Sequence, residues 1–196
     1  MAVYTKINQK EINVINKNFN IDKIISFKGI KQGIENTNYL LKSKKKKYIL
    51  TIFEKRVLQK EIPFFMKLMD NLNNSKINCP KPLKTRNNKY LIKLKNKTAC
   101  IVSFLEGKDK KILNINDCYT VGKTIARMHV VTNKMKLNRK NSMGIKNLKP
   151  LLESIKFKSK KFSNLKLFLN NNLKDINKNW PKQLPKGIIH GDLFID

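Results

Sequence analysis

The stretch "NTNYLLKSKKKKYILTIFEKR", residues 36–56, holds two apolar segments that a run of lysines separates. β-Branched and aromatic residues recur in both segments with stretches of period two, which is typical of β-strands. The charged run "KSKKKKY" at residues 42–48 fits a solvated turn between them. The stretch therefore predicts two neighbouring strands of a sheet, connected at the protein surface.

Further strands are expected on both sides of this pair. The segment at residues 23–34 has the same strand-like pattern. Residues 61–74 differ, because their apolar side chains recur at helical spacing, and the proline-containing stretch at 79–82 breaks that pattern. Residues 88–107 then predict two more strands with a turn near Asn96. The expected order is β-β-β-α-β-β.

The second half of the chain is predicted to be helical. Asn116 or Asp117 would cap a first helix that extends to residue 133. A weaker helix passes through residues 148–155, and Ser163 would cap a third helix that extends to residue 179. Together with the strands of the first half, these helices predict an α+β protein.

The charge of the chain is extreme, at +30 for 196 residues at pH 7. Such a charge is typical of proteins that bind nucleic acid or anionic membranes. Arginine, however, supplies only four of the 43 basic residues, although bidentate contacts to bases and phosphates favour it. The abundance of Lys, Asn and Ile favours a coding bias at solvated positions, so we expect no nucleic-acid partner. A basic nucleic-acid-binding module remains the alternative.

Hydropathy and cysteine content indicate the compartment. The mean hydropathy is −0.48, and the longest apolar stretches are far too short to cross a bilayer. The first residues lack the apolar core of a secretory signal. Cys79, Cys100 and Cys118 form no C-x-x-C pair and support neither a disulfide framework nor a zinc site. We therefore expect a cytoplasmic protein without a membrane partner.

The stretch "IIHGDLF", residues 188–194, is the strongest candidate for a catalytic motif. It places His190 and Asp192 two residues apart after a short expected strand, whose end can hold a carboxylate rigidly while leaving it accessible. Taken alone, the tripeptide is equally compatible with an ordinary Gly-Asp turn. A sheet-rich half followed by helices is, however, also the order of protein kinases. Their catalytic loop has an Asp and, five positions later, a metal-binding Asn.

That fifth position would be residue 197, whereas the chain has 196 residues. We therefore expect the sequence to be a fragment of a longer reading frame, with no metal ligand inside it. We also expect the fragment to be catalytically inactive.

The whole chain resembles the homoserine kinases that have the aminoglycoside/choline kinase-like fold. The segments that carry this resemblance are "MAVYT" (1–5), "SFKGIKQGIENTNYLL" (26–41), "YILTIFEKR" (48–56), "PFFMKLMDNL" (63–72), "CPKP" (79–82), "IVSFLEG" (101–107), "VGKTIARMH" (121–129) and "IIHGDLFID" (188–196). The resemblance implies a two-lobed, protein-kinase-like fold. Its N-terminal nucleotide-binding lobe, a five-stranded antiparallel sheet plus a helix, would span residues 1–105. The helical and incomplete C-terminal lobe would span residues 106–196.

The resemblance also implies an activity, the phosphorylation of the L-homoserine hydroxyl by ATP on the route to threonine. The cofactors would be ATP and Mg²⁺, with the metal ligands expected beyond this chain. Aminoglycoside, choline and ethanolamine kinases share the H-G-D loop and remain alternatives.

Roles for the catalytic loop follow from the same resemblance. Asp192 would orient the substrate hydroxyl and accept its proton, while His190 would support the loop.

The segment from Gly29 to Asn38 takes the place of the loop that folds over the ATP phosphates. Gly29 and Gly33 would let backbone N–H groups approach the phosphate oxygens, and Thr37 and Asn38 would add side-chain donors. Without the resemblance, an ordinary hairpin is the favoured interpretation of this segment.

The remaining candidates belong to the adenine and phosphate contacts. The hinge between the lobes matches Ser103, Phe104, Leu105 and Glu106. Glu61 is a candidate for the glutamate that steadies a phosphate-binding lysine. Thr51 stands where protein kinases carry that lysine, and Lys55, four residues on, would lie on the same strand face. The identity of the cationic phosphate contact therefore stays open.

Overall fold

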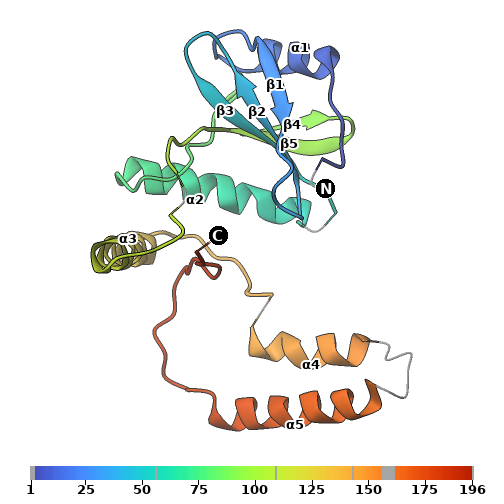
Figure 1. Cartoon of the computed structure of the whole chain (residues 1–196), viewed down its shortest axis with the longest axis vertical. Coiled ribbons are helices and arrows are strands. Elements are labelled where there is room, and N and C mark those ends of the chain that lie inside the picture. The colour runs from blue at the N-terminus through green and yellow to red at the C-terminus, as the bar shows by residue number, and fades with distance from the viewer. Residues whose placement is uncertain (1–2, 56, 109, 143, 156–161, 196) are drawn as a thin grey trace. The chain divides into compact units, whose positions relative to one another are not determined.

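The computed structural model describes residues 3–55, 57–108, 110–142, 144–155 and 162–195. The chain divides into two compact units, one made of residues 1–137 and 188–196 and the other of residues 138–187. The predicted lobe boundary at residues 105 and 106 divides the chain differently and stays a prediction. The elements in Figure 1 are α1 Gln9–Asn18, β1 Ser26–Gly29, β2 Thr37–Lys42, β3 Lys47–Ile52, the 3₁₀ helix η1 Gln59–Glu61, α2 Ile62–Asn74, β4 Leu91–Leu94, β5 Lys97–Ser103, α3 Ile115–Asn133, α4 Ile145–Ser154 and α5 Ser163–Asn179.

The first unit is built on a five-stranded sheet in the order β1-β2-β3-β5-β4, in which every neighbouring pair is antiparallel. This confirms the predicted sheet. The lysine-rich turn is also where the sequence places it, since Lys42 at the end of β2 pairs with Lys47 at the start of β3. The β4–β5 turn is formed by Lys95 and Asn96, both with positive φ, as a tight two-residue hairpin requires.

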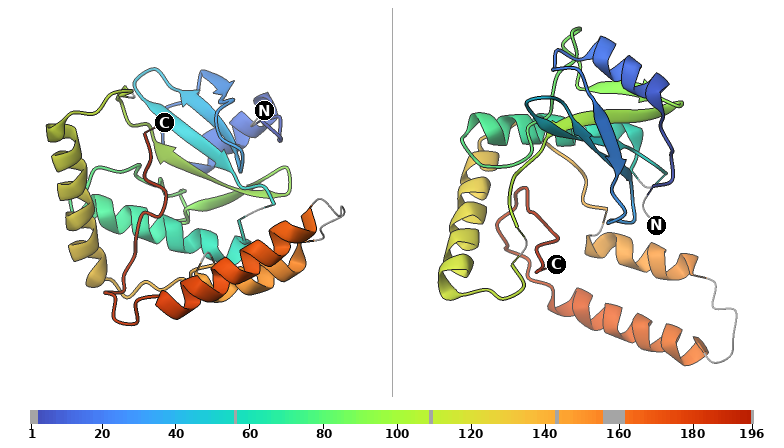
Figure 2. Two further views of the ribbon diagram at one scale, coloured as in Figure 1. Left: turned by 60° about the horizontal axis from the view of Figure 1, so that its bottom comes forward. Right: turned by 45° about the horizontal axis from the view of Figure 1, so that its top comes forward.

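Two helices cover the two faces of this sheet, as Figures 1 and 2 show. Alternation along β3 directs Leu50 and Ile52 into a core with α1, whereas Ile49 packs into a second core with Ile62 and Met66 of α2. All four of the buried side chains Leu50, Ile52, Ile62 and Met66 are at most 1% exposed. The sheet is therefore held rigidly from both sides.

Helix α1 corrects the predicted element order, which has no helix before the first strand. Its signals lie in residues 8–15: the Asn8 side chain accepts from the Lys10 backbone, and the Glu11 carboxylate accepts from the Asn8 backbone N–H. Ile12 and Ile15 then supply the buried face. This capping pattern is a sequence-level start signal, and it is followed by apolar residues at helical spacing.

Helix α3 is present as predicted, but its cap lies earlier in the chain. Asn114, rather than Asn116 or Asp117, is the N-cap; its side chain accepts from the Asp117 N–H, and the Asp117 carboxylate accepts from the Asn114 N–H. Asp117 thus completes the cap from the third helical position. Helix α3 contacts α2 within the same unit.

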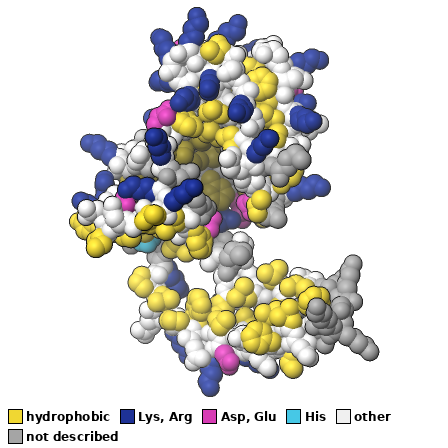
Figure 3. Space-filling view, viewed as in Figure 1, with side chains coloured by type: hydrophobic (Ala, Val, Ile, Leu, Met, Phe, Trp, Pro, Cys, Tyr) yellow, Lys and Arg dark blue, Asp and Glu magenta, His cyan; other side chains and the backbone are white. Residues whose placement is uncertain are grey.

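The second unit contains α4 and α5, which contact each other, and each helix has one buried leucine, Leu152 in α4 and Leu173 in α5. Both helices were predicted, although α5 includes Ser163 and is preceded by Phe162 at the cap position. Much of α5 presents exposed apolar side chains such as Leu167 and Phe168. Apolar side chains also gather on the face of this unit that Figure 3 shows. No helix in the described ranges combines the length and apolar character of a membrane span.

Candidate active site

The loop between β1 and β2 is closed by the backbone of its two ends. The Ile30 N–H donates to the Asn38 carbonyl at 2.9 Å. Within the loop, Gly33 has a φ of +91° and nothing within 4 Å of an added Cβ, so glycine is needed there for its backbone conformation. Gly29 is needed for a different reason, because a Cβ on it would lie 2.9 Å from Cγ2 of Val3. At Gly29, the lack of a side chain therefore allows close packing against the N-terminal segment.

Thr37 and Asn38, the predicted side-chain donors of this loop, lie on opposite faces of β2. Thr37 is fully buried, and its hydroxyl donates to Oε1 of Glu54 at 2.7 Å. It has no exposed surface to offer a phosphate, which argues against the predicted role. Asn38 is half-buried on the α2 side of the sheet, and its Oδ1 accepts from the Thr51 hydroxyl at 2.8 Å. Because the side-chain oxygen is the atom engaged, the Asn38 amide N–H groups are not used in that hydrogen bond.

Thr51 therefore lies beside Asn38, but Lys55 does not belong to the strand at all. β3 ends at Ile52, and Lys55 is an exposed residue in the bend that follows. The expected placement of Thr51 and Lys55 on one strand face is wrong, because alternation holds only within a strand.

Glu61 ends η1, immediately before α2, with its N–H donating to the Leu58 carbonyl at 2.8 Å.

Glu54 is a site residue that sequence reasoning missed. Its carboxylate forms an ion pair with Lys97 and accepts from the hydroxyls of Thr5 and Thr37, each at 2.7 Å. Burial of the carboxylate opposes its ionisation. The hydrogen bonds from Lys97, Thr5 and Thr37, with the charge of Lys97, outweigh burial and hold the pKa of Glu54 below its usual value. The signal available in the sequence was an isolated acidic residue directly after an apolar strand.

The predicted hinge continues the pairing of β3 with β5. Ser103 pairs with Tyr48, and the Phe104 N–H donates to the Lys47 carbonyl at 3.3 Å. The Lys47 ammonium lies 5.1 Å from the centre of the Phe104 ring and 2.8 Å from a Glu106 oxygen. Strand β3 thus fixes the start of the hinge.

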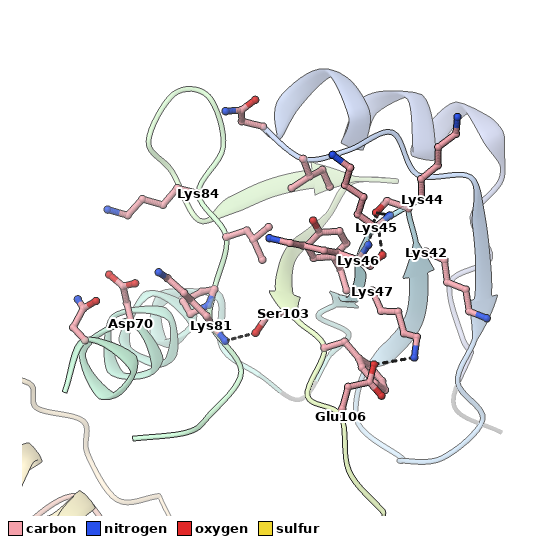
Figure 4. Close-up of a pocket in the computed structure, with 18 residues that line it drawn as sticks. Lys42, Lys44, Lys45, Lys46, Lys47, Asp70, Lys81, Lys84, Ser103 and Glu106 are labelled. Atoms are coloured by element: carbon pink, nitrogen blue, oxygen red, sulfur yellow. Dashed lines mark hydrogen bonds and ion pairs between the residues drawn. The ribbon is translucent and has the colours of Figure 1, made fainter. Parts of the chain in front are cut away.

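An open hollow of about 1000 Å³ lies beside this hinge (Figure 4). Its lining contains Ser103, Phe104 and Glu106, but neither the β1–β2 loop nor Asp192. The hollow therefore does not unite the predicted nucleotide-binding residues. Seven lysines line it, namely Lys42, Lys44, Lys45, Lys46, Lys47, Lys81 and Lys84.

Two acidic residues share the lining of this hollow, and both are already engaged. Glu106 pairs with Lys47, and Asp70 accepts from the Tyr90 hydroxyl at 2.7 Å. Burial, together with the hydrogen bond to Asp70 and its negative charge, raises the pKa of Tyr90 to about 12. Positive charge therefore dominates the hollow.

The His-Gly-Asp motif lies in an irregular segment with a left-handed backbone conformation at its glycine. Gly191 has a φ of +79°, and the Asp192 N–H donates to Nδ1 of His190 at 3.4 Å. Both side chains are exposed, so the Asp192 carboxylate is accessible. The strand expected before the motif is wrong, because residues 184–195 belong to no strand and pair with none of the five strands of the sheet.

No group of three or more His, Cys, Asp or Glu side chains suited to a metal ion occurs in the described part of the chain.

Comparison with protein families identifies a match to the phosphotransferase enzyme family over residues 26–196. Among curated proteins, the homoserine kinase of Paramagnetospirillum magneticum is 38% identical over 197 residues and that of Methylocella silvestris 36%. Each match covers 100% of this chain and 60% or 61% of the relative. The chain thus spans about 60% of the length of the curated relatives it matches.

Among solved structures, a spectinomycin phosphotransferase in complex with ADP and spectinomycin has a TM-score of 0.63 at 17% identity. The match covers 97% of this chain and 64% of that one. A microcompartment-associated aminopropanol kinase has a TM-score of 0.56 at 13% identity, covering 74% of this chain and 48% of that one. The fold is therefore the kinase-like fold of these phosphotransferases, as the resemblance implied.

Proposed function

This chain belongs to the phosphotransferase enzyme family, and from that premise we propose that the protein phosphorylates the hydroxyl of L-homoserine with ATP. The observation that carries the proposal is identity of 34–38% along the whole chain to proteins named homoserine kinase. A solved relative of the same fold holds ADP, which supports a nucleotide as the phosphoryl donor.

Asp192 is the proposed catalytic base. Its exposed carboxylate in the His-Gly-Asp motif would accept the proton of the substrate hydroxyl while the hydroxyl oxygen bonds to the γ-phosphorus and the bond to ADP breaks. His190 would hold the loop, since its Nδ1 accepts from the Asp192 N–H. The positive φ at Gly191 would set the direction of the backbone that carries the base.

The proposed phosphate contacts are largely neutral donors. Backbone N–H groups of residues 31–36 would face the phosphates, and the Asn38 amide, oriented by Thr51, would add a side-chain donor. The hinge, Ser103 to Glu106, would meet the adenine through its backbone. Lys55 and Glu61 remain proposed contributors to the charge around the phosphates.

We further propose Mg²⁺ as a cofactor, since it neutralises developing charge in phosphoryl transfer.

We also propose a cytoplasmic location, with which the three free cysteines are compatible.

The second candidate is another small alcohol as acceptor, because the solved relatives act on spectinomycin and aminopropanol by name. A panel decides between the candidates: ADP release is measured for the full-length gene product with L-homoserine, spectinomycin, aminopropanol, choline and ethanolamine. We expect kcat/KM for L-homoserine to exceed the others by roughly tenfold or more, as hydrogen-bonded recognition allows. Preference for another alcohol would replace the proposed substrate, and no turnover with any would refute the function.

Residues 1–196 assayed alone test a separate expectation. We expect no turnover from them, because they span only about 60% of the length of the homoserine kinases they match. Turnover would refute the expected inactivity without touching the proposed substrate.

A further inference from the structure

We propose that the N-terminal segment, residues 3–7, positions the β1–β2 loop for nucleotide binding, with Tyr4 as the positioning residue for the loop tip. The inference rests on the proposed function, because that function assigns this loop to the nucleotide phosphates.

The N-terminal segment is fixed to β2 by hydrogen bonds. The Thr37 hydroxyl accepts from the backbone N–H groups of Tyr4 and Thr5, at 3.0 and 3.1 Å. The Tyr39 hydroxyl donates to the Thr5 carbonyl at 3.1 Å and accepts from the Ile7 N–H at 3.3 Å. Thr5, Thr37 and Tyr39 are all buried, so these bonds are shielded from water.

Glu54 and Lys97 fix the middle of the same segment. The Thr5 hydroxyl donates to Glu54 and accepts from the Lys97 ammonium, each at 2.7 Å. Because Glu54 also binds the Thr37 hydroxyl, one carboxylate joins the segment, β2 and the start of β5. The segment therefore has a defined position over the end of the sheet from which the loop projects.

From that position the segment and its partner Glu54 contact the loop at three places. Val3 packs against Gly29 at the loop's start, where it leaves no room for a Cβ. The Tyr4 hydroxyl donates to the Ile34 carbonyl in the tip at 3.0 Å. The Glu54 N–H donates to the Asn36 side chain at 3.3 Å, at the loop's end.

The bond from Tyr4 to Ile34 is the contact that can be removed most cleanly. The Tyr4 side chain is exposed, and Ile34 is 70% exposed, so losing the hydroxyl opens no core. A less restrained tip loses more conformational freedom when it orders around phosphates, and this lowers affinity. A purely structural tyrosine would not affect nucleotide affinity in this selective way.

The test compares Tyr4→Phe with Tyr119→Phe. Tyr119 is also exposed and lies on α3, where its ring contacts Lys123 through a cation–π interaction that phenylalanine retains. Hydrogen exchange of residues 30–36 is measured without nucleotide, ADP affinity by calorimetry, and the melting temperature by circular dichroism. For Tyr4→Phe we expect faster exchange in the loop and roughly twofold to tenfold weaker ADP binding, the range of one net hydrogen bond. We expect an unchanged melting temperature and no effect from Tyr119→Phe.

Each outcome has one meaning. Unchanged loop exchange in Tyr4→Phe overturns the positioning contact itself, and faster exchange with unchanged ADP affinity overturns its role in nucleotide binding. A lowered melting temperature with the same loss of ADP affinity would mark Tyr4 as structural. Failure of the unaltered protein to bind ADP would instead count against the proposed function.

Discussion

Replacing Glu54 with glutamine tests whether the cluster around it stabilises the sheet. The substitution keeps the shape and an acceptor oxygen for the hydroxyls of Thr5 and Thr37, but it removes the charge that faces Lys97. The chain offers a matched control in Glu106→Gln, because Glu106 also pairs with a lysine, Lys47.

The two pairs differ mainly in the burial of the carboxylate. The lysine side chains are similarly exposed, 40% for Lys97 and 43% for Lys47, whereas Glu54 is 10% exposed and Glu106 74%. Removing one partner of a fully buried pair costs about 3–5 kcal/mol, and an exposed pair contributes about 0.5 kcal/mol. Because Lys97 can reach water, we expect about 2 kcal/mol for Glu54→Gln, against at most about 0.5 kcal/mol for Glu106→Gln.

Hydrogen exchange of the buried strand amides is the appropriate assay, for example at Leu41 and Leu50. Fluorescence is unsuitable, since the single tryptophan, Trp180, lies in the other unit. The pH dependence adds a second check. The lowered pKa of Glu54 means that its contribution is present above the ordinary glutamate pKa and is lost as pH falls through the folded-state value. A loss for Glu54→Gln no larger than for Glu106→Gln, or one independent of pH, would refute the reasoning.

Three further predictions concern single contacts. Gly29→Ala should lower the free energy of unfolding, measured with denaturant, by about 1–3 kcal/mol through overpacking. Adding Val3→Ala should restore most of the lost free energy, and additive losses in the double variant would contradict this. The free energy of unfolding should fall as pH rises from about 10 towards 12, because the pKa of Tyr90 is raised to about 12 in the folded state. In Tyr90→Phe the share of this fall that Tyr90 causes should vanish, and an unchanged fall would refute the role of Tyr90. Thr51→Val should weaken ADP binding by roughly twofold to tenfold through loss of the hydrogen bond that orients Asn38, and unchanged calorimetric affinity would exclude that role.

The parts of the fold that could be predicted are those specified locally. The β2–β3 hairpin follows from alternation on either side of the lysine turn at residues 42–48, and the β4–β5 turn from residues near Asn96. Helix α1 was not predicted, although its capping residues are present in the sequence. Only Ile12 and Ile15 in it are buried and the surrounding sequence is polar, so the apolar pattern of a helix is weak there.

The parts that could not be predicted depend on residues far apart in the chain. Glu54 and Lys97 are 43 residues apart, so their pairing emerges only once β3 and β5 are neighbours. Burial of Thr37 depends on the N-terminal segment that covers it, which no local pattern around Thr37 indicates. The strand expected before His190 illustrates the same limit, because a strand needs a partner that sequence periodicity does not supply.

The most direct test of the central claim is the turnover of Asp192→Asn in the full-length gene product with ATP and L-homoserine. The control is Asp175→Asn, a substitution at an exposed aspartate of α5. The account predicts that kcat falls by roughly 10²–10⁴-fold for Asp192→Asn, the range for loss of a general base, while ADP affinity and the control variant stay unchanged. A kcat for Asp192→Asn close to that of the unaltered enzyme would contradict the assignment of Asp192 as the catalytic base.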